Sequence, residues 1–249
     1  MRTMLGQLAG LILGLALCGP AVARCQDDAK PKVDWSDCSK TQLMLSGDDM
    51  TDAVLRGAVL TSTDLSKAKL ARAKLSEAEV SFARFENADL SGADLAKAIG
   101  WRASFKQAKL EGASLNTAQM SRSSFVQAKL AGANLSKSEM NRSDFSGADL
   151  TGADLSKAEL ARVIFADTKL PGVNLGYANL ARAKLAGADL TGATFTGAYL
   201  YRTQLRGTDL SKTKGLAQDQ IEDACGTADT KLPAGLKPPQ AWPCIEEDE

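Results

Sequence analysis

Hydrophobic side chains recur at every fifth position along most of this chain. From Leu45 to Leu210 the 34 positions five apart are Leu, Phe, Met or Val, with the single exception of Gly100. From Leu55 onwards a small residue or valine stands two positions before each of them, and between 53 and 208 it is alanine at 23 of 32 places. The other positions are mostly polar. The unit is therefore small-x-large-x-x, as in Ala88-Asp89-Leu90.

A strict period of five fits neither an α-helix nor a continuous strand. On a helix, residues five apart are rotated by about 140°, so the leucines would spiral around the axis instead of forming a stripe. In a strand, an odd spacing would place successive leucines on opposite faces. The chain must therefore turn once in every unit. Four short sides with inward-pointing small and large residues would close a coil of 20 residues, and stacked coils would pair at about 4.8 Å.

A period of 20 residues is also visible in individual residue types. Phenylalanine recurs at this interval on the inner face, arginine at one outer corner and glycine at another, where a bend benefits from its freedom. The three columns are Phe85, Phe105, Phe125, Phe145 and Phe165; Arg102, Arg122, Arg142, Arg162, Arg182 and Arg202; and Gly92, Gly112, Gly132, Gly152, Gly172 and Gly192. Four sides per coil are therefore favoured over three.

Units such as Ala133-Asn134-Leu135 and Ala148-Asp149-Leu150 resemble the A(D/N)LXX motif of the pentapeptide-repeat family. The resemblance covers residues 43–212 and implies an all-β fold, a right-handed quadrilateral parallel β-helix. The 34 units make about 8.5 coils of 20 residues, a rod of roughly 40 Å. Some members of the family resemble duplex DNA and bind topoisomerases, so a DNA-mimic function is an alternative here.

Four positions depart from the repeat. Larger residues replace alanine at Val163, Thr168 and Val173, and Gly100 lacks the large inward side chain. We expect a bulge or a cavity at Gly100, filled by Met120 or by Trp101 turned inward.

The first 23 residues have the features of a secretory signal peptide. A basic start, an apolar run from Leu5 to Leu17 and the A-x-A sequence that ends at Ala23 predict cleavage after Ala23. The protein would then be periplasmic or secreted, with no transmembrane segment in the mature chain. Lipid attachment at Cys18 is a second hypothesis, although Leu17 replaces the small residue that this motif prefers.

The mature chain keeps four cysteines, two on each side of the repeats. In an oxidising compartment they predict two disulfides, and the local pairs Cys25–Cys38 and Cys225–Cys244 are the simplest of the three possible pairings. Residues 24–42 would form an N-terminal cap that includes Trp35. Residues 213–249 would form a C-terminal cap, with a short amphipathic helix between 216 and 225 that Gly226 stops, and a proline-rich tail.

Composition excludes several classes of function. The chain of 249 residues has no histidine, which removes the usual general base and the commonest metal ligand. No nucleophile–base pair, phosphate loop or metal cluster is recognisable, so we expect no enzyme and no cofactor. The 30 basic and 30 acidic residues balance. Cleavage would remove only Arg2 and leave 29 against 30, so no nucleic acid is expected as a partner.

The arginine column is the one outer feature that repetition of the fold does not require. Six guanidinium groups at about 4.8 Å would repel by about 0.9 kcal/mol per neighbouring pair in water. Glu139, Glu159 and Asp144 are placed to offset part of this charge. Phe82, Trp101 and Tyr201 would offer ring faces to the cations.

Two interpretations of the arginine column are open. One is a purely structural rod with no specific ligand, in which the arginines stack or pair with neighbouring acids. The other is an interaction or scaffold module that binds an anionic partner, either an acidic protein surface or an anionic envelope polymer.

Overall fold

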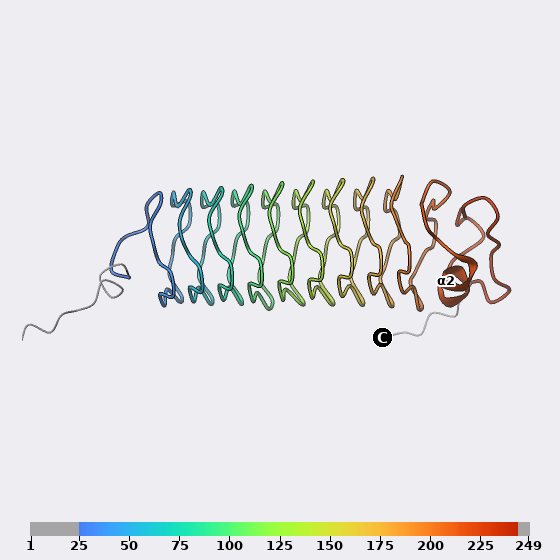
Figure 1. Ribbon diagram of the computed structural model, residues 1–249, viewed down its shortest axis with the longest axis horizontal. Helices are drawn as coiled ribbons and strands as arrows, with labels where there is room; N and C mark the ends of the chain where they lie inside the picture. Colours follow the sequence, from blue (N-terminus) through green and yellow to red (C-terminus); the bar gives the residue numbers. More distant parts are fainter. Residues whose placement is uncertain (1–24, 244–249) are drawn as a thin grey trace, which may run out of the picture.

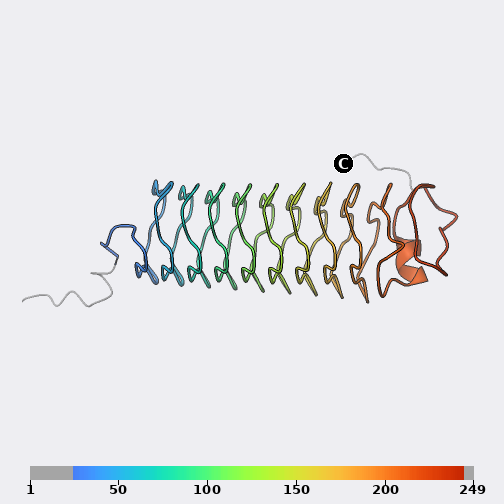
Figure 2. The same ribbon diagram turned by 90° about the horizontal axis from the view of Figure 1, so that it is seen from above.

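The computed structural model describes residues 25–243, which form a straight rod of stacked coils (Figures 1 and 2). Parallel bridges join residues 20 apart, such as Asp34 with Val54 and Asp144 with Ile164. The bridge residues are themselves five apart along the chain. The structure therefore confirms a β-helix with a 20-residue register.

A left-handed corner residue ends every unit. At every fifth residue from Lys32 to Gly207 the backbone φ is positive, and the following amide closes a turn, as in the 3.0 Å bond from Ala53 N to Met50 O. This φ is the one that a type II turn requires at its third residue. The predicted glycine column occupies one set of these corners, with φ between 65° and 73°.

The interior is continuous and mostly apolar. The inward Leu, Met and Phe side chains and the alanines two residues before them are buried along the whole rod. Phe85, Phe105 and Phe125 stack with centroids 4.8 and 4.9 Å apart and nearly parallel rings. At the end of this stack the ring centroids of Phe145 and Phe165 are 5.4 Å apart and the rings are tilted by 28°. This distortion coincides with the predicted departure from the repeat at Val163.

Gly100 produces neither a bulge nor a cavity. Its amide donates to Gln119 O at 2.7 Å, so the ladder continues. A Cβ built on Gly100 would meet the Met120 sulfur at 2.1 Å, which shows that Met120 fills the space. The alternative of an inward Trp101 is wrong, because this ring is 47% exposed.

The N-terminal cap is integrated with the rod. Cys25 and Cys38 form the predicted disulfide, and the Trp35 ring is buried with its indole N–H donating to Asp27 O at 3.1 Å. The regular turns already start at residue 31, before the predicted first repeat at 43. The signal segment 1–23, with Cys18, lies outside the described residues.

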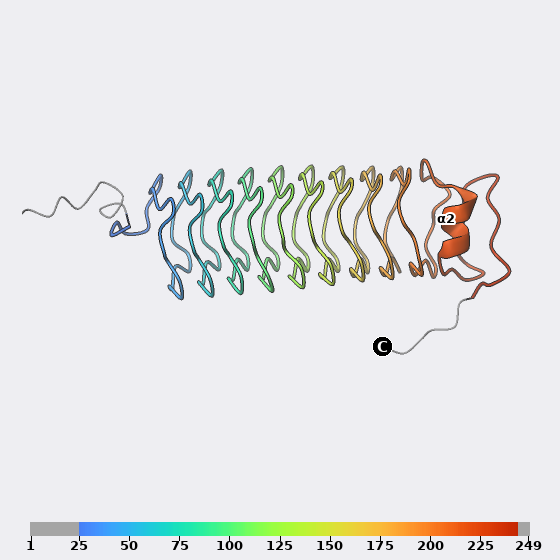
Figure 3. The ribbon, with the colours of Figure 1, turned by 60° about the horizontal axis from the view of Figure 1, so that its bottom comes forward.

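The C-terminal cap is built on helix α2 (Gln218–Asp223), which lies across the end of the rod (Figure 3). Gln220 is buried, and its side-chain amide donates to Phe195 O and Ala198 O at 2.9 and 2.6 Å. Beyond the helix the ladder of parallel bridges departs from the 20-residue register, because Gln204 bridges Cys225 instead of residue 224. The cap thus supplies hydrogen-bond partners to several backbone groups of the last coil, such as Arg202 N, which donates to Asp223 O, and Leu205 N, which donates to Cys225 O.

The predicted glycine stop is wrong. The helix ends at Asp223 with an extended residue at Ala224, and Gly226 has no positive φ. A Cβ at Gly226 would meet the Trp242 ring at 2.3 Å, so this glycine is needed for close packing. Cys225 is disulfide-bonded, whereas its predicted partner Cys244 lies outside the described residues. No helix within 25–243 is long and apolar enough to cross a membrane.

Candidate binding edge

The six arginines form a single column at one corner of the rod. Bridges between the sides that flank it keep the 20-residue register, as in Glu139 with Glu159 and Ser124 with Asp144. Each arginine is the left-handed corner residue, with φ between 53° and 62°. Arg102, Arg122 and Arg142 are exposed, and the three that follow are half-buried. The column is thus a surface feature along six coils.

The carboxylates that we expected to offset this charge do not pair with it. Within the described part of the chain, the side chains of Arg102, Arg122, Arg142, Arg162 and Arg182 make no ion pair and no hydrogen bond. Glu159 instead accepts a 2.8 Å hydrogen bond from Asn179 Nδ2, and Asp144 accepts bonds from the amide and hydroxyl of Ser146. Two of the three candidate acids thus bind uncharged donors instead of the arginines.

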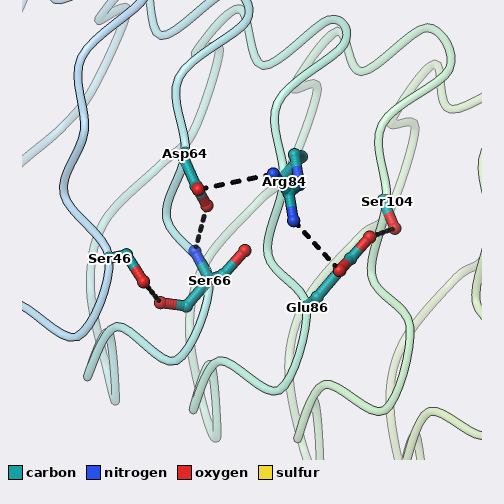
Figure 4. Close-up of polar contacts among 6 residues, drawn as sticks. All are labelled: Ser46, Asp64, Ser66, Arg84, Glu86 and Ser104. Atoms are coloured by element: carbon teal, nitrogen blue, oxygen red, sulfur yellow. Dashed lines mark hydrogen bonds and ion pairs between the residues drawn. The ribbon is translucent and has the colours of Figure 1, made fainter.

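Arginines elsewhere on the rod show what a paired guanidinium looks like. The guanidinium nitrogens of Arg84, on the neighbouring side, lie 3.5 Å from an Asp64 carboxylate oxygen and 3.4 Å from one of Glu86 (Figure 4). The Ser104 hydroxyl donates a hydrogen bond to the other carboxylate oxygen of Glu86. At a different corner, Arg72 makes two 2.8 Å bonds to Asp52. Ion pairing between coils is therefore available to this fold, and within residues 25–243 the first five arginines of the column do not use it.

Aromatic rings contact the column near its two ends. The Arg102 guanidinium carbon lies 6.0 Å from the Phe82 ring centroid, and that of Arg122 lies 5.8 Å from Trp101. At the far end Arg202 lies 5.7 Å from Tyr201. The predicted cation–π contacts are therefore present, although Trp101 faces Arg122 across one coil.

Sequence reasoning missed two members of this surface. Ile99 and Tyr199 are 41% and 50% exposed on the side that leads into the same corner, and Tyr199 stacks on Tyr201 at 6.1 Å. Each stands two residues before an aromatic residue already singled out, a spacing that could have identified both. Within residues 25–243 seven large apolar side chains are exposed, and five of them lie here: Phe82, Ile99, Trp101, Tyr199 and Tyr201.

The rest of the described surface has no comparable gathering of residues. Two shallow hollows of about 250 and 320 Å³ lie on another side, near Asp189 and Lys129, and include none of the arginines of the column. Residues 25–243 contain no cluster of three or more potential metal-binding side chains. We therefore take the arginine column and its five apolar neighbours as the candidate site, and call it the arginine edge.

Comparison with known proteins identifies the repeats. The family model described as "Pentapeptide repeat region" matches residues 98–175 and 138–214, and that described as "Pentapeptide repeats (8 copies)" matches 45–76 and 64–99. The chain belongs to the pentapeptide-repeat family. The resemblance drawn from the A(D/N)LXX motif is thus confirmed, and the family consists in general of structural or interaction modules.

Two solved structures of this family are similar to the chain, and the first of them shows the same fold at low sequence identity. Full-length QnrB1, a plasmid-mediated fluoroquinolone resistance protein, is 18% identical, with a TM-score of 0.58 over 82% of this chain and 92% of its own. HetL, involved in heterocyst differentiation regulation in the cyanobacterium Nostoc sp. strain PCC 7120, is 29% identical, with a TM-score of 0.31 over 82% and 91%. No curated protein matches the chain.

Proposed function

We propose that this protein is a non-enzymatic, exported interaction module that presents the arginine edge to an anionic partner. The observation that supports this most is the pairing pattern. Arg72 and Arg84 bind carboxylates of adjacent coils, whereas five arginines of the column bind none in the described residues. A planar guanidinium left without an acid can bind a carboxylate or phosphate of a partner through two parallel hydrogen bonds.

The proposal takes the β-helix as a four-sided rod of about 8.5 coils over residues 43–212. Its caps, 24–42 and 213–249, would keep the ends from pairing with other chains. Export with cleavage after Ala23 would place it in the periplasm or outside the cell, where an acidic protein surface or an anionic envelope polymer is available.

Retention on a cation-exchange matrix tests this proposal. The protein has a sequence pI near 6.4, so at pH 8 a molecule that responds only to net charge should be repelled by a matrix of carboxylate or sulfonate groups. A local strip of arginines should nevertheless hold it at low salt. We expect Arg122→Gln, Arg142→Gln and Arg162→Gln together to abolish retention.

The matched control removes the same charge at another corner. Lys97, Lys137 and Lys157 are also exposed, left-handed corner residues at intervals of 40 and 20. Replacing these three lysines by glutamine should leave most of the retention in place. Equal loss in both triple variants, or no retention of the wild-type protein, would instead favour the purely structural rod.

A further inference from the structure

The arginine edge has a regular longitudinal repeat. The inner rings of successive coils are 4.6–4.9 Å apart in the undistorted part of the stack, and this spacing sets the distance between successive corners. Between Trp101 and Tyr201 lie five such steps, about 24 Å. A ligand that contacts the whole edge must therefore carry anionic groups in register with the coil spacing.

Short side chains stand beside the arginines along this interval. The corner position next to each arginine is aromatic at Trp101 and Tyr201, and between them it is Ser121, Asn141, Ala161 and Ala181. Asn141 is also folded onto the backbone, where its Oδ1 accepts the amide of Ala161 at 2.9 Å. The guanidinium groups are thus flanked by short side chains, and an exposed aromatic ring lies at each end of this interval.

Common anionic polymers differ in how well they match this repeat. On an extended peptide, side chains of one face recur at about 6.7 Å, so acidic residues would be out of register by about 8 Å after four coils. The phosphates of one strand of B-form DNA advance by about 3.4 Å. An extended polyuronate carries one carboxylate per sugar and advances by a little less than one coil spacing per sugar, so its carboxylates stay closer to register with the coils than the charges of the other two polymers.

We propose that the arginine edge binds a linear polyuronate that lies parallel to the rod axis. Guanidinium groups of the column bind its carboxylates, and the faces of Trp101 and Tyr201 stack on the C–H faces of sugar rings at the two ends. This inference rests on the proposed function and names its ligand. Because the edge is a convex corner, affinity comes from many weak contacts in series, so it depends on the length of the polymer.

Isothermal titration of the protein with oligogalacturonates of increasing length tests the ligand class. We expect little binding of the dimer, binding that strengthens through the tetramer and hexamer, and no further gain per site beyond about six sugars, one for each arginine corner of the column. The triple variant of Arg122, Arg142 and Arg162 to glutamine should lose this binding, while the triple lysine variant should keep it.

Substitution of the two terminal aromatic residues distinguishes polyuronate binding from general binding of anions. Trp101→Ala with Tyr201→Ala should weaken binding of the hexamer by about tenfold or more, as expected for lost stacking contacts, and leave cation-exchange retention nearly unchanged. Tyr177→Ala, which removes an exposed tyrosine at another corner, is the control.

Two results would overturn the polyuronate while the proposed function stands. One is retention on the cation-exchange matrix without binding of any oligogalacturonate. The other is binding of poly-L-glutamate or duplex DNA as tight as that of polygalacturonate at equal charge, which would show that charge alone is recognised. If the wild-type protein is not retained on the cation-exchange matrix, both the polyuronate and the proposed function are overturned.

Discussion

Each arginine of the column occupies a corner residue whose φ lies between 53° and 62°. This region costs a residue with a Cβ about 1–2 kcal/mol, whereas glycine adopts it freely. The chain places glycine at six positions of another corner, so the fold accepts glycine there. The arginines therefore carry backbone strain, which they share with other non-glycine corner residues such as Lys97 and Gln107, and in addition they repel one another.

Replacing Arg142 by glycine should stabilise the protein and weaken binding. Relief of the corner strain and of repulsion outweighs the added freedom of glycine in the unfolded chain, for a net gain of about 1 kcal/mol in the free energy of unfolding. Urea denaturation measures this. Arg72→Gly should gain less, because it also loses the two bonds to Asp52; a clear destabilisation by Arg142→Gly would contradict the strain argument.

Outward aspartates have a local role that the repeat pattern alone did not reveal. In Asp49–Thr51, Asp149–Thr151 and Asp209–Ser211 the carboxylate accepts both the amide and the hydroxyl of the residue two positions later. These bonds fix the entry to each corner. An Asp followed two residues later by Ser or Thr was the signal in the sequence.

Protonation of these aspartates should loosen the corners at low pH. The Ser211 hydroxyl and amide, with Lys231, lower the pKa of Asp209 to about 2, and Thr151 lowers the pKa of Asp149. A folded-state pKa below the unfolded value of about 3.9 gives a stabilisation that is complete above pH 4 and lost as the pH falls towards 2. Denaturation midpoints between pH 7 and 2 measure it, and Asp209→Asn should show a smaller acid-induced loss.

At the scale of elements, the repeating sides were predictable and the caps only in part. The sides follow from a pattern in which a small and a large residue, nearly all of them apolar, point inward in each unit, so their register is fixed locally. Helix α2 was also expected, but its end was not, because Gly226 serves contact with Trp242 and this contact joins residues far apart in sequence. The filling of Gly100 by Met120 likewise depends on packing between coils.

The C-terminal cap should depend on Gln220. Its amide binds two carbonyl oxygens of the last coil, and Gln220→Ala would leave both buried without this donor, at a cost of about 1–3 kcal/mol. Hydrogen exchange should accelerate around residues 195–205. Gln218→Ala, which removes bonds on the exposed side of the same helix, should have little effect. Unchanged exchange in Gln220→Ala would contradict the capping role.

For the whole molecule, stacking of coils makes stability a sum of neighbouring contacts. Reduction of the disulfides should therefore increase hydrogen exchange first in the terminal coils, near Cys25–Cys38 and Cys225, and leave the phenylalanine stack protected. Simultaneous loss of protection along the rod would contradict this quasi-one-dimensional behaviour.

The most direct test of the arginine edge is arginine-selective labelling with phenylglyoxal, followed by peptide mass spectrometry, with and without polygalacturonate. We expect protection of the exposed column arginines Arg102, Arg122 and Arg142. Two exposed arginines outside the column, Arg72 and Arg56, which lies beside the corner residue Gly57, should react at unchanged rates. Uniform protection of all arginines, or none in the column under conditions where the polymer is bound, would contradict the account.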